Sequence, residues 1–232
     1  MKANRLLILG CAVALGSMVH AQSHGNATGL GVSATGSPHN FYDGIDNPSH
    51  RDPTTAADET FTGEICNVCH VPHGGLHAYT EGLLWNHELS SQVFTMYPQD
   101  SLDGTVAAQP TNSTRLCMGC HDDTVAVDAF GHGPPRTNFA SNWGIYTSGQ
   151  NLGGTHPVSL IYDNIADTEL RDPATTPMGT SGMIEDVLEG ALSNSMECNS
   201  CHDVHDTDTV AGTSLLRVDT GGSELCLVCH DK

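Results

Sequence analysis

Four copies of one short motif contain the residues whose types and spacing suggest chemistry. In each copy, two cysteines separated by two residues are followed directly by a histidine. Such a motif attaches a c-type haem through two thioethers, and its histidine binds the haem iron. The copies are CNVCH at 66–70, CMGCH at 117–121, CNSCH at 198–202 and CLVCH at 226–230. We number the four predicted haems 1 to 4 in this order.

The motifs contain every cysteine of the sequence except Cys11. The predicted attachment residues are Cys66, Cys69, Cys117, Cys120, Cys198, Cys201, Cys226 and Cys229, and the predicted proximal iron ligands are His70, His121, His202 and His230. Cysteine pairs of this spacing also build zinc sites, but zinc does not require a histidine after every pair. Disulfides within the pairs would be strained and easily reduced. The sequence therefore predicts four covalently bound c haems.

The motifs belong to a longer internal repeat. Both halves of the chain contain CxxCHxxH, then LL, then LCxxCH. A loop histidine precedes each copy, His39 in SPHNF and His156 in THPVS. We therefore divide the chain into a first dihaem unit at 22–132, which includes an N-terminal arm, and a second dihaem unit at 133–232.

Each iron of a low-spin electron carrier needs a second axial ligand, which is histidine or methionine. Histidines outside the motifs outnumber the irons, whereas the methionines share no position of the repeat. We therefore expect bis-histidine ligation at all four haems, which favours low reduction potentials. The predicted distal ligands are His39, His73, His156 and His205.

Equivalent positions in the repeat suggest which iron each distal histidine binds. His39 and His156 precede the first motif of their units, so we assign them to haems 1 and 3. His205 follows the third motif and is assigned to haem 2, the last haem of the preceding unit. His73 has the same place in the first unit, where this rule would require a haem of a preceding unit.

Haem 4 is the iron left without a ligand by this assignment, because its motif is followed by only two residues. We therefore expect His73 to bind haem 4 of a neighbouring copy. Such a head-to-tail contact does not close on itself and builds a filament. The alternative is that His73 binds haem 4 or haem 2 of its own chain and that the protein is a monomer.

The composition favours a fold built around haem rather than around side chains. Aromatic residues are 5% of the chain, which contains 25 glycines and 11 prolines. We expect a mostly irregular, loop-rich multihaem cytochrome c organised around a haem chain, with a few short α-helices and minimal β-structure. Apolar spacing predicts a helix within 182–194, and alternation predicts a short strand at 124–130.

His87, in the segment LLWNHELS, is a further candidate ligand for haem 1 or haem 2. We favour another interpretation, in which Trp85 packs on a haem face and His87 lies at the surface.

The N-terminus predicts export. MKANR is followed by the apolar run LLILGCAVALGSMV and then by VHA, which is typical of a secretory signal peptide at 1–21. A lipid anchor at Cys11 is the alternative, and it is disfavoured because the apolar run continues well beyond that residue. No other stretch is long and apolar enough to predict a membrane span.

The charge of the chain limits its partners. A net charge of −19 disfavours nucleic acid and anionic membranes, because both repel an acidic protein. We expect an extracellular or cell-surface protein, with the periplasm as the alternative location.

The motifs and the segments around them, taken in series, resemble those of OmcE-like outer-surface tetrahaem cytochromes. These cytochromes belong to a wider class with doubled CxxCH motifs. The similarity includes GEICNVCHVPH, GLLWNHELS, GGTHPVSLIYD and LCLVCHDK. It implies a loop-rich, haem-packed fold, bis-histidine ligation, and extracellular filaments in which a histidine of one subunit ligates a haem of another. One departure is Asp123 in CHDDTVA, where relatives commonly have glycine.

Two other functions are alternatives. A monomeric periplasmic electron shuttle would contain the same haems, and a multihaem reductase would keep one iron open for its substrate. All four motifs end in histidine and further histidines are abundant, which disfavours an open iron. We therefore predict an electron carrier and not an enzyme, with further copies of itself, other redox proteins or extracellular acceptors as its partners.

Overall fold

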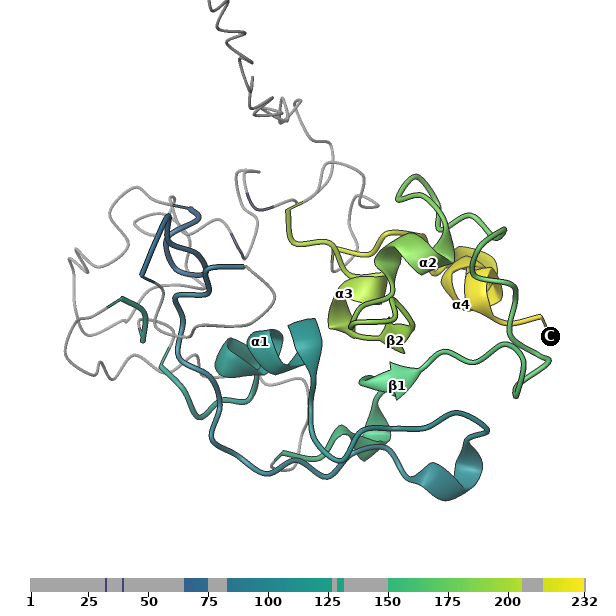
Figure 1. The fold of residues 1–232 in the computed structure, drawn as a ribbon, viewed down its shortest axis with the longest axis horizontal. Helices are drawn as coiled ribbons and strands as arrows, with labels where there is room; N and C mark the ends of the chain where they lie inside the picture. The colour runs from purple at the N-terminus through teal and green to yellow at the C-terminus, as the bar shows by residue number, and fades with distance from the viewer. Residues whose placement is uncertain are drawn as a thin grey trace, which may run out of the picture.

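Short helices joined by long irregular segments make up the chain (Figure 1). This is a computed structural model, and it describes residues 32, 39, 65–74, 83–126, 129–131, 150–205 and 215–231. The α-helices are α1 (Asn112–His121), α2 (Ile184–Val187), α3 (Cys198–Cys201) and α4 (Glu224–Cys229), and 3-10 helices span Gln99–Ser101, Leu152–Gly154 and Gly221–Ser223. Strands β1 (Leu160–Ile161) and β2 (Ser195–Met196) pair antiparallel. The predicted loop-rich fold with few short helices and minimal β-structure is confirmed.

Two small apolar clusters replace a single large core in the described residues. One contains Tyr162, Ile184, Leu188 and Met196, and the partly buried Cys201 and Cys229 pack against it. The other contains Phe94, Met118 and Leu152. Three of these residues lie within the CxxCH motifs, so the apolar clusters adjoin the positions at which haems are attached.

The backbone reproduces the internal repeat around the first motif of each unit. Val71 N donates to Leu84 O (3.1 Å) in one unit, and Asp203 N donates to Leu215 O (2.8 Å) in the other. Leu84 and Leu215 both have positive φ, 48° and 60°. Two leucines in this rarely used conformation at equivalent positions indicate that the same turn returns the chain to the motif in both units.

Two positions after Leu84 and Leu215, a side chain supports the motif of each unit. Asn86 Nδ2 donates to Asn67 O (2.7 Å) in the first unit, and Arg217 Nε donates to Asn199 O (3.0 Å) in the second. Different side chains thus hold the same carbonyl of the motif. In the second unit Arg217 also forms a salt bridge of 3.0 Å with Asp203.

The helix predicted within 182–194 is only one turn long, α2. Gly182 and Gly190 have positive φ, 96° and 85°, and Leu188 is extended. Ser195 N donates to Glu189 O (2.9 Å), which closes a turn where the helix was expected to continue. The apolar spacing was correct for burial of Ile184 and Leu188, but the helix ends at Val187, because Leu188 is extended.

The strand predicted at 124–130 is also wrong for the described part of that segment. Asp122 Oδ1 accepts hydrogen bonds from Thr124 N (2.8 Å) and Val125 N (3.3 Å). Ala129 N donates to Ala126 O (2.9 Å). An aspartate that binds the backbone two residues ahead makes a turn, and this turn replaces the strand.

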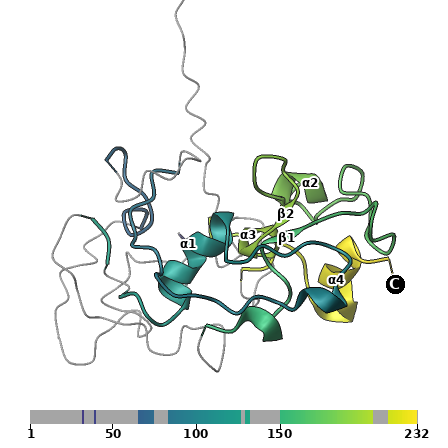
Figure 2. The same ribbon diagram turned by 60° about the horizontal axis from the view of Figure 1, so that its bottom comes forward.

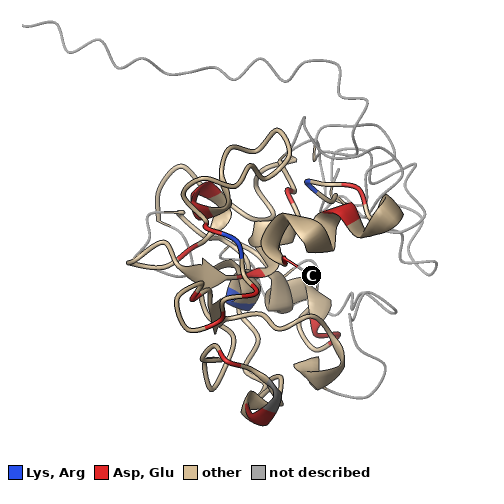
Figure 3. Cartoon of the chain, turned by 90° about the vertical axis from the view of Figure 1, so that its right-hand side faces the viewer, with Lys and Arg blue, Asp and Glu red and all other residues tan. Residues whose placement is uncertain are grey.

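Several predictions fall on other parts of the chain. The signal peptide at 1–21 and the boundary between 132 and 133 lie outside the described residues and stay predictions. Within the described residues, no helix has the length and apolarity needed to cross a membrane. Acidic side chains occur on many of the described segments and basic ones on few (Figure 3).

Candidate haem sites

Each CxxCH motif forms one tight turn. The backbone N–H of the histidine donates to the carbonyl of the first cysteine in motifs one, three and four, at 2.8, 3.0 and 2.9 Å. The second motif forms the last turn of α1. One helical turn places both thiols and the imidazole on neighbouring positions, as attachment of one haem requires.

The four motifs follow one another in space in the order of the sequence. The Cys69 and Cys120 thiols interact electrostatically, which links motifs one and two. The Cys117 and Cys198 thiols share a hydrogen bond, which links motifs two and three. Cys229 interacts with Cys201, which links motifs three and four. Figures 1 and 2 show the same order, because α3 lies between α1 and α4 in both views.

Burial keeps several of these thiols protonated in the haem-free chain. Burial, with a smaller contribution from Cys66, raises the pKa of Cys69 to about 12. Burial likewise raises the pKa of Cys201 to about 11 and that of Cys229 to about 12. Since the thiolate is the nucleophilic form, burial disfavours reaction of these three cysteines at neutral pH.

Three pairs of histidine rings have the spacing of two axial ligands on one iron. The ring centroids are 6.1 Å apart for His70 and His205, 6.0 Å for His39 and His121, and 6.4 Å for His156 and His230. A metal–imidazole bond of about 2.0 Å on each side of an iron places the two ring centres about 6 Å apart. The residues present therefore fit a haem iron in each of the three gaps.

Hydrogen bonds to the rings fix which nitrogen faces the iron. His70 Nδ1 lies 2.7 Å from Leu83 O, and His156 Nδ1 lies 2.9 Å from Pro157 O. Because a carbonyl only accepts, Nδ1 carries the proton in both rings, and Nε2 keeps its lone pair for a metal.

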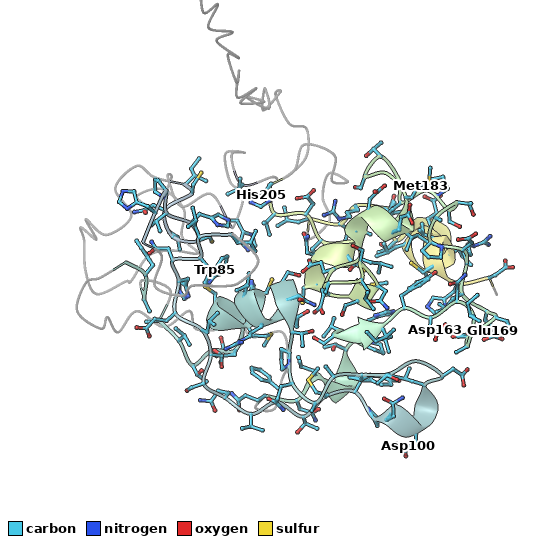
Figure 4. The ribbon with its side chains drawn as sticks, in the orientation of Figure 1. Trp85, Asp100, Asp163, Glu169, Met183 and His205 are labelled. Carbon is cyan, nitrogen blue, oxygen red and sulfur yellow. The ribbon has the colours of Figure 1, made fainter. Side chains whose placement is uncertain are left out.

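Trp85 supplies a second indication that a haem fits. Its indole meets the His70 ring edge-on, with centroids 5.6 Å apart. Its Nε1 is buried and has no acceptor among the described residues. Buried donors in native proteins are paired, and a haem propionate at the His70 site would supply the missing acceptor. Trp85 and His205 both lie on the side of the molecule away from α4 (Figure 4).

The ring pairs differ from the pairings predicted from the repeat. His39 lies beside the ligand of haem 2, not haem 1, and His205 lies beside the ligand of haem 1, not haem 2. His156 lies beside the ligand of haem 4, not haem 3. The ring pairs therefore favour His121, His70 and His230 as the partners of His39, His205 and His156, and the distal-ligand assignments stay predictions. In both units the loop histidine reaches the second motif instead of the first.

The remaining two histidines of the predicted set are His73 and His202. His73 is exposed. His202, which directly follows α3, is half-buried. In sequence, His73 has the same position after motif one that His205 has after motif three.

His87 is fully buried, which corrects its predicted place at the surface. Its Nδ1 lies 2.8 Å from Glu88 O, and its Nε2 lies 3.4 Å from Cys120 Sγ. It therefore packs against an attachment residue of haem 2. The signal that could have indicated this burial is the small residue Gly119, in the motif that His87 packs against.

Gly119 allows the segment at 87–88 to approach α1. A Cβ at this position would lie 2.6 Å from Glu88 O and 3.3 Å from His87 Nδ1. We expect Gly119→Ala to lower the free energy of unfolding of the haem-loaded protein by about 1–3 kcal/mol, because backbone must move to admit the methyl group. Denaturant titration measures the loss. Gly154→Ala, where a Cβ meets nothing within 4 Å, is the matched control and should change stability little.

Comparison with known proteins agrees with this site. A family model described as the doubled CXXCH motif matches residues 191–232, which contain motifs three and four. A search of curated proteins found no match. The family match and the motifs support a multihaem c-type cytochrome that binds haem c covalently and carries electrons.

Proposed function

We propose that this protein is an exported tetrahaem cytochrome that polymerises head to tail into an extracellular filament conducting electrons toward other redox proteins or extracellular acceptors. The observation that supports it most is the continuous order of the motifs. Cysteines of each motif interact electrostatically with cysteines of the next, so four haems on this chain would form one series of neighbours.

The chain's own residues hold and orient the haems. Haem supplies an iron that cycles between ferric and ferrous states. The motif cysteines would attach the haem covalently and the paired imidazoles would bind its iron, while backbone carbonyls such as Leu83 O fix the tautomer of the imidazole. Histidines on both sides of the iron would leave no position for a substrate, which favours electron transfer.

The ring pairs supply a rule for the last iron. Loop histidines pair with the second motif of their own unit, and His205 pairs with the first motif of the preceding unit. By the same rule, His73 would pair with the first motif of the unit that precedes its own, which in a polymer is the second dihaem unit of a neighbouring copy. This first motif is that of haem 3 in the neighbouring copy. The proposed contact is therefore His73 to haem 3, and it replaces haem 4 of the sequence-based expectation.

A solution experiment tests this proposal. We expect the haem-loaded protein to contain four haems per chain by pyridine haemochrome assay, and to form polymers by light scattering and electron microscopy. Dilution to monomers should convert one iron to a high-spin state that binds carbon monoxide when reduced. A monodisperse monomer with four low-spin irons that ignores carbon monoxide would instead identify a soluble shuttle, and a carbon monoxide-binding iron retained in the polymer would favour a reductase.

A further inference from the structure

A buried carboxylate lies where the two dihaem units meet. Glu197 is 1% exposed. Its Oε1 accepts hydrogen bonds from Thr111 Oγ1 (2.7 Å), Asn112 Nδ2 (2.9 Å) and Ser195 Oγ (2.6 Å), and its Oε2 accepts one from Ser159 Oγ (3.0 Å). Four neutral donors from three separate segments converge on one side chain.

Hydrogen bonds, rather than a cation, stabilise this carboxylate. The two ion pairs among the described residues join Arg171 to Asp231 and Arg217 to Asp203, and neither includes Glu197. Hydrogen-bond donors on both oxygens offset the cost of removing this carboxylate from water. The negative charge at this position is therefore not neutralised by a neighbouring side chain of opposite sign in the described part of the chain.

The charge lies beside two haem attachment residues. Glu197 directly precedes Cys198, and α3 packs on α1. Cys198 N donates to Thr114 Oγ1 (3.0 Å) in α1, and the Cys198 thiol is within hydrogen-bonding reach of Cys117. Glu197 thus occupies the junction between the attachment sites of haems 2 and 3, as the adjacent positions of α1 and α3 in Figure 2 make visible.

A second carboxylate adds charge of the same sign at this junction. Glu189 Oε2 accepts a hydrogen bond from Ser113 N (3.0 Å), while its Oε1 is buried and has no donor among the described residues. Glu189 interacts electrostatically with both Cys117 and Cys198. Arg217 lies nearby, because its Nε donates to Asn199 O in motif three, but its charge is paired with that of Asp203 at 3.0 Å. The two carboxylates of the junction are not paired with it.

We infer that the negative charge of Glu197, together with that of Glu189, lowers the reduction potentials of haems 2 and 3 relative to those of haems 1 and 4. A ferric haem carries one more positive charge than a ferrous haem, so a nearby fixed negative charge stabilises the ferric state. The effect is largest where water is excluded, because the effective dielectric constant is then low. This inference rests on the four-haem protein proposed above but not on its polymerisation.

The test is a spectroelectrochemical redox titration of the full haem-loaded protein with Glu197→Gln. Glutamine keeps the shape and an acceptor oxygen, and the Ser159 hydroxyl can rotate to accept from its amide. We expect two of the four haems to titrate at higher potential, with a ferrous-to-ferric ratio raised about tenfold at fixed potential, which for a one-electron couple is about 59 mV. The other two haems should move much less.

Glu185→Gln is the matched control, because it removes the same charge from an exposed position of α2. Its titration should superimpose on that of the parent. Glu189→Gln should shift the same two haems upward by a smaller amount, and it serves as the test if Glu197→Gln does not accumulate in folded form. The reduction potential is the informative quantity, because a purely structural role of Glu197 would alter stability without raising the potentials of these two haems.

The inference is overturned if both junction variants titrate like the parent, if the shift is downward, or if all four haems move equally. A haem count other than four would contradict the proposed function instead, and the haemochrome assay on the same sample separates the two failures.

Discussion

Replacing His73 with alanine is expected to abolish polymerisation and to leave one of the four irons high-spin at any protein concentration. The side chain is exposed and belongs to the repeat position whose counterpart, His205, pairs with a motif of the other unit. Without it, the haem at His202 of the neighbouring copy lacks its sixth ligand and the copies lose a coordinate bond. Size-exclusion chromatography and the high-spin absorption band of the ferric protein measure the two effects.

Added imidazole provides the control for this variant. Free imidazole should bind the open iron and restore a fully low-spin spectrum, but it should not restore polymers, because it does not connect two chains. Filaments of normal length formed by His73→Ala would show that this histidine makes no contact between copies. A variant that stays monomeric with all irons low-spin would place its role outside ligation.

The pairing of His156 with haem 4 predicts a second large effect. We expect His156→Ala to add one high-spin, carbon monoxide-binding iron to the parent, since its ring lies 6.4 Å from that of His230. In a parent that lacks haem 4, made by Cys226→Ala with Cys229→Ala, the same substitution should add none, because the iron that it would expose is absent. Titration with carbon monoxide counts the open irons in each background.

His39→Ala is the matched control for this pair of backgrounds. Its ring lies beside that of His121, so it should open the iron of haem 2 and add one carbon monoxide-binding site whether or not haem 4 is present. If His156→Ala still adds one open iron in the parent without haem 4, the ligand belongs to another haem, and the pairing predicted from the repeat would be supported in place of the ring pair.

The local chemistry of the chain was predictable from sequence because it depends on short spacing. The cysteine, second cysteine and histidine of each motif lie within five residues and form one turn in all four copies, and the matched hydrogen bonds around Leu84 and Leu215 follow from the repeat. The loop-rich fold was predictable for a related reason. A chain with many glycines and few aromatic residues cannot fill a large interior with side chains.

The ring pairs were not predictable in the same way, because they join residues distant in sequence. His39 and His121 meet across most of the first unit, and no local pattern distinguishes the first motif from the second as its target. Val32 N donates to Val204 O (2.8 Å), so Val32 also lies beside the residue preceding His205. Contacts of this kind depend on the path of the whole chain.

Asp123 shows what sequence comparison alone leaves unexplained. Its φ is 58°, in the left-handed region that glycine adopts without strain. A glycine, which the resemblance implies at this position, would adopt the same φ without strain. Aspartate is among the few other residues that tolerate the conformation, so the departure carries no separate functional meaning.

The three ring pairs also bear on how so small an apolar interior holds together. Each iron would tie a histidine near one end of a long loop to a histidine at the other, with a thioether-anchored ring between them. Like disulfides in small secreted domains, such cross-links restrict the unfolded chain and so raise the relative free energy of that state. Mechanical and thermal endurance of this protein would then reside in its coordination bonds, and extraction of the metal would release several loops together.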